Sequence, residues 1–129
     1  MEVDVPAEPA PVSIEVTPYG DGIALVTVAG ELDVETAPEL RNRLADQIRA
    51  GRRHLLLDLS EVPFMDSSGI NALLKAHDEA GRAGGSVCLV SPAPMVRRVL
   101  DLTGVSLTIA SLDGVEAALA HVGEGTSPH

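Results

Sequence analysis

The stretch LDLSEVPFMDSSGI, residues 57–70, decides the fold, because it leads from an apolar run through a loop into the start of a helix. The run HLLLDL at 54–59 is short and apolar, as is typical of a buried parallel strand. After the loop, Ser67 or Ser68 can cap the next helix, whose apolar residues recur at helical spacing. A strand followed by a helix in this way predicts an α/β fold built around a parallel sheet.

The flanking sequence predicts the other elements in the order β-β-α-β-α-β-α-(β)-α. Residues 12–17 alternate apolar and polar side chains, and with the β-rich run 23–29 they form a hairpin. A helix follows that ends at Gly51, and Thr36 with Glu39 has the spacing of a capping box at its start. Strands at 86–90 and, more weakly, 107–110, and helices at 93–102 and 113–122 complete the order. We therefore expect a mixed sheet of four to five strands, with about four α-helices that cover mainly one face.

The length of 129 residues is that of one domain. Residues 1–11 are rich in proline and acids, which predicts a disordered leader. Residues 123–129 have a similar composition and predict a flexible tail. The folded domain is therefore expected over residues 12–122.

The charge balance limits the kinds of partner. Nine Lys and Arg against 19 Asp and Glu give a formal net charge of −10, which repels phosphate backbones and anionic lipid surfaces. No apolar segment reaches the length of a membrane helix, and the N-terminus lacks the basic start of a secretion signal. We expect no direct binding of nucleic acid or membrane, a cytoplasmic location, and a basic protein or a cation as the natural complement.

Signatures of catalysis and of cofactor binding are missing. The sequence contains no phosphate-binding GxxxxGK[ST] loop and no HExxH pair, and the single Cys88 cannot form a thiolate cluster. Four histidines are scattered, and those at 54 and 77 are expected to have solvated structural roles. We predict no cofactor, no metal site and no enzymatic activity.

The loop before the second helix allows two interpretations. Hydroxyls at a helix start satisfy free N–H groups, which alone would justify Ser67 and Ser68. The same position, at the C-terminal edge of a parallel strand, is where α/β folds place function, and a phosphate there would meet the positive end of the helix. Glu31 and Asp33 are similarly open, either as turn polarity or as an acidic contact surface for a protein partner.

Three motifs together resemble the STAS family, specifically the bacterial anti-sigma factor antagonists. They are the stretch from Asp58 to Gly69, the sequence Gly30-Glu31-Leu32-Asp33 after the second strand, and the segment from Ser91-Pro92 to Thr103-Gly104. Their order and spacing match the family over about residues 12–122. The resemblance implies a STAS fold.

For function, the resemblance implies a binding protein that is switched by phosphorylation. Proteins of this kind bind an anti-sigma factor, which is also a serine kinase of the GHKL ATPase type, and so free a sigma factor. The kinase phosphorylates the position of Ser67, and a PP2C-type phosphatase removes the phosphate. Other residues then shape the site (Asp33, Asp66, Ser68 and Gly69), and two more pack beneath or line the contact surface (Phe64 and Met65).

Two alternatives remain open at this point. A STAS module can also be a regulatory or structural subunit of a transporter or of a stress-sensing assembly, without phosphate turnover. An enzyme that uses Ser67 as a nucleophile is disfavoured, because no histidine stands in a motif-like relation to this serine.

Overall fold

The protein is described by a computed structural model that covers residues 12–125, with side chains to residue 122. The leader predicted for residues 1–11, and residues 126–129 of the predicted tail, lie outside the described residues. The elements are β1 (Val12–Pro18), β2 (Ile23–Gly30), α1 (Ala37–Arg49), β3 (His54–Glu61), α2 (Ser67–Arg82), β4 (Ser86–Val90), α3 (Pro94–Thr103), a 3₁₀ turn (Val105–Leu107), β5 (Ser111–Leu112) and α4 (Val115–Gly125).

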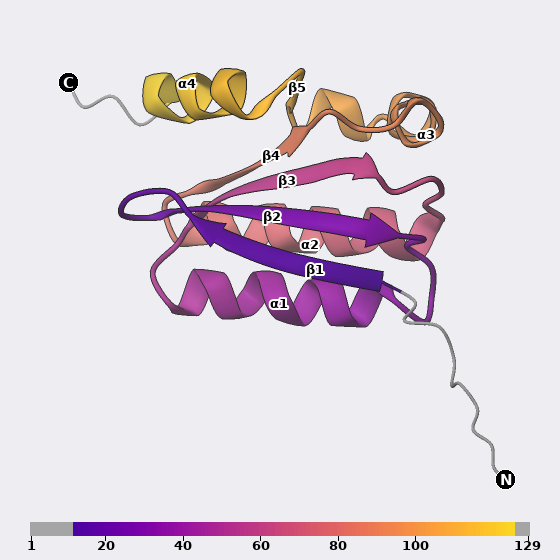
Figure 1. The fold of residues 1–129 in the computed structure, drawn as a ribbon, viewed down its shortest axis with the longest axis horizontal. Coiled ribbons are helices and arrows are strands. Elements are labelled where there is room, and N and C mark those ends of the chain that lie inside the picture. Colours follow the sequence, from indigo (N-terminus) through magenta and orange to yellow (C-terminus); the bar gives the residue numbers. More distant parts are fainter. Residues whose placement is uncertain (1–11, 126–129) are drawn as a thin grey trace, which may run out of the picture.

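The strands form one five-stranded sheet in the order β1-β2-β3-β4-β5 (Figure 1). The hairpin pair β1–β2 is antiparallel, and the pairs β2–β3, β3–β4 and β4–β5 are parallel. The predicted mixed sheet and the α/β class are therefore confirmed. Since the parallel strands all run the same way, the loops that follow β2, β3 and β4 meet at one edge of the sheet.

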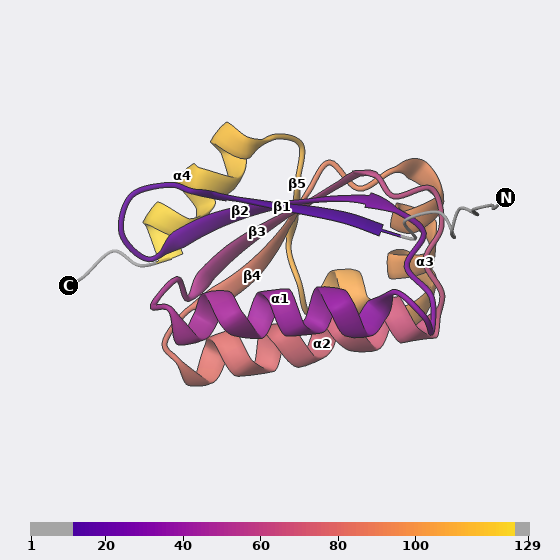
Figure 2. The ribbon, with the colours of Figure 1, turned by 60° about the horizontal axis from the view of Figure 1, so that its bottom comes forward.

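Helices lie on both faces of the sheet, but unequally. Figure 2 shows α1 and α2 side by side on one face and α4 on the other. Alternate residues of β3 point to opposite faces, so that Leu55 and Leu57 join the large core cluster whereas Leu56 packs with Cys88 in a smaller cluster under α4. The large cluster also receives Val96 and Leu100 of α3. Coverage is thus mainly on one face, as predicted.

The strand predicted at 107–110 is wrong. The chain forms a 3₁₀ turn at Val105–Leu107, and the short strand β5 follows at Ser111–Leu112. Gly104 adopts the left-handed conformation at φ +82°, which ends α3, and the N–H of Leu107 donates to its carbonyl at 3.0 Å. Local β-propensity is overridden by this turn, and pairing with β4 decides where the strand begins.

Gly85 allows a close approach between the chain entering β4 and the chain entering β3. A Cβ atom at this position would lie 2.0 Å from the carbonyl oxygen of Arg53, which accepts the N–H of Ser86 at 3.0 Å. The clash would be with backbone, so a side-chain rotation cannot relieve it.

We predict that Gly85→Ala lowers the free energy of unfolding by about 2 kcal/mol, because backbone must move to admit the methyl group. Gly81→Ala is the matched control, since Gly81 lies within α2 and nothing is within 4 Å of its added Cβ. The control should gain up to about 1 kcal/mol from helix propensity. Urea unfolding of both variants measures the difference, and equal midpoints would contradict this reading of Gly85.

Candidate functional site

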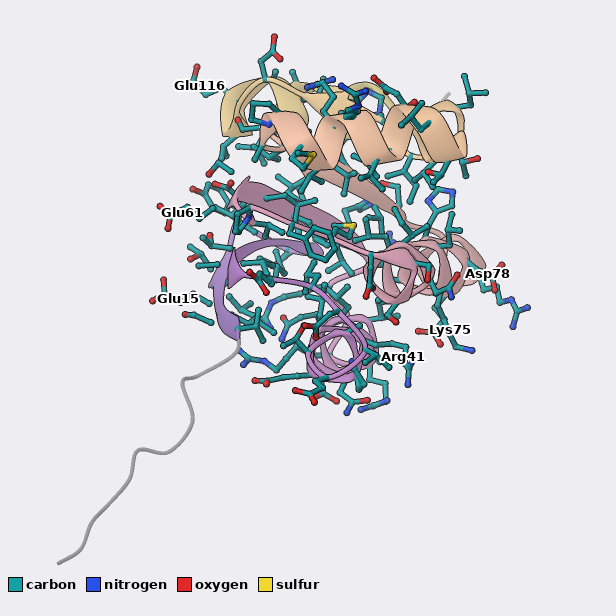
Figure 3. All side chains as sticks on the ribbon, turned by 90° about the vertical axis from the view of Figure 1, so that its right-hand side faces the viewer. Glu15, Arg41, Glu61, Lys75, Asp78 and Glu116 are labelled. Carbon is teal, nitrogen blue, oxygen red and sulfur yellow. The ribbon has the colours of Figure 1, made fainter. Side chains whose placement is uncertain are left out.

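The loop after β3 and the loop after β2 are fastened together at the C-terminal edge of the sheet. The N–H of Leu32 donates to the carbonyl of Phe64 at 3.0 Å, and the N–H of Asp66 donates to the carbonyl of Leu32 at 3.0 Å. Leu32 and Met65 form an isolated parallel bridge there. This tie brings together the two acidic and polar motifs that the sequence separates by about thirty residues. Figure 3 looks onto this edge, with the labelled Glu61 pointing outward from the core.

Asp66 is the residue that caps α2. Its backbone is extended, its carboxylate accepts the N–H of Ser68 at 2.8 Å, and its carbonyl accepts the N–H of Ile70 at 3.1 Å. The prediction that Ser67 or Ser68 caps this helix is therefore wrong. Asp66 takes the role because its side chain reaches the free N–H of the second helical residue.

Ser67 is consequently free of a capping role. It is the first residue of α2, its side chain is exposed, and its hydroxyl forms no hydrogen bond with the described residues. Ser68 beside it is half-buried. The exposed hydroxyl stands at the positive end of a helix of 16 residues.

Asp33 organises the turn between β2 and α1. Its carboxylate accepts the N–H groups of Glu35 at 2.9 Å and Thr36 at 3.1 Å. The capping box predicted for Thr36 and Glu39 is wrong, because the buried Thr36 hydroxyl instead donates to the carbonyl of Glu31 at 2.7 Å. The interpretation of Asp33 as turn polarity is confirmed, whereas the acidic contact surface stays a prediction.

Beneath the site, Gly69 lets α2 lie directly on the two joined loops. A Cβ at this position would lie 2.5 Å from Cγ of Met65 and 3.0 Å from Cβ of Leu32, and both of these side chains are buried. Met65 therefore packs under the serine rather than lining the surface. Close packing of these three residues holds the start of α2 in place.

Two apolar side chains are exposed on the same loops. Phe64 is 45% exposed and Val34 is 71% exposed, and the hydrogen bond from Leu32 to the carbonyl of Phe64 brings their loops together. Phe64 was predicted to lie at the surface or beneath it, and it lies at the surface. The sequence did not lead us to predict Val34 as a surface residue of this site. Its position as an apolar residue between Asp33 and Glu35 is the pattern that could have indicated it.

Acidic side chains on or beside the same two loops have no ion-pair partner among the described residues. Within residues 12–122, the ion pairs are Arg49–Asp46 on α1 and Arg82–Asp78 on α2, and both lie away from this edge. The acids at the edge take part in none of these pairs: Glu31, Asp33, Glu35, Glu61 and Asp66. Among the described residues, no basic side chain therefore forms an ion pair with these acids.

The candidate metal ligands and the one cysteine of the described residues lie as follows. No three His, Cys, Asp or Glu side chains of this part of the chain gather where they could hold a metal ion. Cys88 is buried, and burial raises the pKa of its thiol to about 11, which keeps it protonated. No helix within residues 12–125 is both long and apolar enough to cross a membrane.

With this geometry established, comparison with known families gives a clear result. The model of the STAS domain family matches residues 16–119, and the chain belongs to this family. Curated relatives are named anti-sigma factor antagonists. The anti-sigma F factor antagonist of Paenibacillus polymyxa is 29% identical over 102 residues, covering 78% of this chain and 87% of that protein. The anti-sigma-F factor antagonist RsfB of Mycobacterium tuberculosis is 29% identical over 117 residues, covering 90% and 95%.

Solved structures agree with the observed fold. An anti-sigma factor antagonist from Mycobacterium paratuberculosis superposes with a TM-score of 0.79 at 29% identity, covering 90% of this chain and 97% of that one. The unphosphorylated form of the anti-sigma factor antagonist SpoIIAA superposes with a TM-score of 0.74 at 23% identity, covering 90% and 100%, which supports the fold.

The capping role of Asp66 can be tested separately from its charge. Asp66→Ala should lower the free energy of unfolding by about 1 kcal/mol, because the N–H of Ser68 loses its acceptor. Asp66→Asn keeps an acceptor oxygen while removing the charge, and it should stay within about 0.5 kcal/mol of the wild type. Thermal and urea unfolding of the two variants measure this, and equal losses would show that the cap is not the stabilising interaction.

Proposed function

We propose that this chain is an anti-sigma factor antagonist whose binding to an anti-sigma factor serine kinase is switched off by phosphorylation of Ser67. The observation that carries the proposal is the exposed, unbonded hydroxyl of Ser67 on the first residue of α2, within an acidic and apolar surface. The curated relatives, which are named as antagonists of anti-sigma factors, support the same role.

The position of Ser67 can accept a phosphate without unfolding the domain. The first N–H groups of a helix have no partner within the helix, and here Asp66 takes those of Ser68 and Ile70. The N–H groups of Ser67 and Gly69 are left to meet an anion at the positive helix end. Phosphorylation would therefore change the surface rather than the fold.

A phosphate on Ser67 would oppose docking through charge. It adds about −1.5 to −2 charges beside the Asp66 carboxylate. In the free protein water screens this repulsion, but a docked partner would displace that water. One like-charge contact at about 4 Å costs on the order of 4 kcal/mol at an effective dielectric constant near 20, which is close to a thousandfold in affinity.

The surroundings of Ser67 supply the docking surface. Phe64 and Val34 offer exposed apolar area on the two joined loops, and acidic residues on or beside the same loops add negative charge. Such a surface suits a partner that places an apolar pocket over Phe64 and Ser67 and keeps its basic side chains at the periphery, so that no cation faces the side chain of residue 67. Asp33, Ser68, Gly69 and Met65 act by shaping and supporting this surface.

The chain's partners in this proposal carry the catalytic chemistry. A kinase of the GHKL type would bind ATP and transfer its γ-phosphoryl group to the Ser67 hydroxyl, with ADP as the leaving group. A PP2C-type phosphatase would hydrolyse the phosphoserine and release inorganic phosphate. The antagonist itself is then a substrate and a binding protein, with no enzymatic role of its own. A cytoplasmic location goes with such partners.

The competing proposal is a STAS subunit of a larger assembly without phosphate turnover. The murine anion transporter Slc26a9 superposes with a TM-score of 0.69 at 21% identity, covering 81% of this chain and 18% of that one, which supports a shared fold only. Mass spectrometry after incubation with ATP and the co-purified kinase separates the two proposals. A single phosphate on Ser67 supports the switch, and an unmodified protein supports the subunit.

The electrostatic switch predicts how Ser67 variants bind the kinase. Ser67→Asp should weaken binding at least tenfold, because it places a permanent negative charge beside Asp66. Ser67→Asn has the same shape without the charge and should bind within about threefold of the wild type. Ser67→Ala should bind normally but resist phosphorylation, whereas Ser68→Ala should still be phosphorylated.

These affinities can be measured by calorimetry with the kinase recovered from the native cell. Equal affinity of Ser67→Asp and Ser67→Asn would exclude charge as the basis of the switch. If the Ser67→Ala variant is still phosphorylated, the phosphate acceptor is a residue other than Ser67.

The apolar centre of the docking surface yields a separate prediction. Phe64→Ala and Val34→Ala should each weaken kinase binding about tenfold, since buried apolar anchors dominate interface energies. Leu107→Ala is the control, because Leu107 is 91% exposed but belongs to the 3₁₀ turn after α3 and not to the loops after β2 and β3. A larger loss for Leu107→Ala than for Phe64→Ala would place the docking surface elsewhere.

A further inference from the structure

A polar pocket lies at the opposite end of the sheet from Ser67. It has a volume of about 320 Å³ and opens where β3 and β4 begin and α4 ends. Its lining consists of Arg53, His54, Gly84, Gly85, Ser86, His121 and Val122. From His54 to Glu61, β3 alone spans roughly 23 Å, so the two regions do not overlap.

His54 and Ser86 form a buried pair in this pocket. Nδ1 of His54 lies 3.1 Å from Oγ of Ser86, and the histidine is only 8% exposed. The expected solvated role of His54 is thus wrong, because the pairing of β3 with β4 sets it directly beside Ser86. Nε2 of His54 has no partner among the described residues and is not sealed from solvent.

The His54–Ser86 pair always offers a proton donor to a ligand. If the Ser86 hydroxyl donates to Nδ1, then Nε2 carries the ring hydrogen; if Nδ1 donates, the Ser86 hydroxyl hydrogen is free. Burial, and secondly the charge of Arg53, lower the pKa of His54 below its usual value. An anion in the pocket would oppose both effects and favour the imidazolium, which adds another donor.

Arg53 provides positive charge over the pocket. Its Nε lies 4.0 Å from the point where a Cβ atom on Gly84 would stand. Its side chain is exposed and forms no ion pair with the described residues. His121 of α4 also lines the pocket. No acidic side chain lines this pocket among the described residues, although the whole chain carries a net charge of −10.

The carbonyls of Glu79, Ala80 and Gly81, near the end of α2, already have backbone hydrogen-bond partners. The end of α2 is closed by its own turn, because the N–H groups of Ala83, Gly84 and Gly85 donate to the last carbonyls of the helix. These three carbonyls are therefore satisfied and do not face the pocket unpaired. The same bonds occupy the glycine N–H groups, so binding depends on side chains.

We infer that this pocket binds a small phosphate anion, either inorganic phosphate or the phosphate group of a small monoester, through Arg53, the His54–Ser86 pair and His121. Arginine, imidazole and hydroxyl donors match the oxygens of a phosphate, and the volume is at the lower end of ligand pockets. The inference is independent of the proposed switch at Ser67.

The test is an NMR titration of the ¹⁵N-labelled full chain with inorganic phosphate. A titration with chloride at equal ionic strength is the control. A second arm uses glycerol phosphate. We expect saturable shifts of the Gly84, Gly85 and Ser86 amides and of the His54 ring. Tighter binding of glycerol phosphate than of phosphate would identify a monoester as the ligand, and the reverse would identify the free ion.

Variants separate a built site from general attraction to positive charge. Arg53→Gln should weaken phosphate binding about tenfold, the loss expected for one charge-assisted hydrogen bond. Arg82→Gln is the matched control, because it removes the same charge from the same end of the molecule without lining the pocket. Its affinity should change less than twofold.

Two results would overturn the inference. One is the absence of saturable shifts at these residues with either ligand, and the other is an equal loss of affinity in Arg53→Gln and Arg82→Gln. Ser67→Ala should bind phosphate like the wild type. Failure at the pocket would therefore leave the switch untouched, and failure of the switch would leave the pocket untouched.

Discussion

The contact of Gly69 with Met65 and Leu32 is the constraint on which the serine site depends. Because residue 69 has no side chain, α2 can begin directly on top of the joined loops after β2 and β3. The two backbone hydrogen bonds between these loops then fix the position of the first turn of α2 relative to the edge of the sheet. Ser67, two residues before Gly69, is left on the outer side of this contact.

The division of labour between Asp66 and Ser67 follows from that arrangement. In many helices a serine at the start accepts a hydrogen bond from a free backbone N–H group through its hydroxyl oxygen. Here Asp66 already accepts the N–H of Ser68, and the hydroxyl of Ser67 is left without a structural task. A side chain that the fold does not need can be modified without loss of the fold, which is a requirement for a switch that acts through charge alone.

The two ends of the sheet differ in electrostatic character. Unpaired carboxylates gather where the parallel strands end, whereas Arg53 and His121 surround the pocket where β3 and β4 begin. The net charge of −10 is a sum over the whole chain and does not reveal this uneven distribution of charge. A single chain of this size can therefore present a basic protein and a small anion with separate, suitable surfaces.

Local sequence determined the element order, the mixed sheet and the placement of the Asp-Ser-Ser-Gly loop between β3 and α2, because periodicity and turn residues act over a few positions. It did not determine which residue caps each helix, since Asp66 and Ser67 are both good caps in isolation and only the path of the loop selects between them. The exposure of Val34, the burial of Met65 and the position of β5 depended on contacts with distant segments. The His54–Ser86 pair joins residues 32 positions apart, and strand pairing alone brings them together. Tertiary structure decided these features because they rest on the register and packing of elements that do not adjoin in the chain.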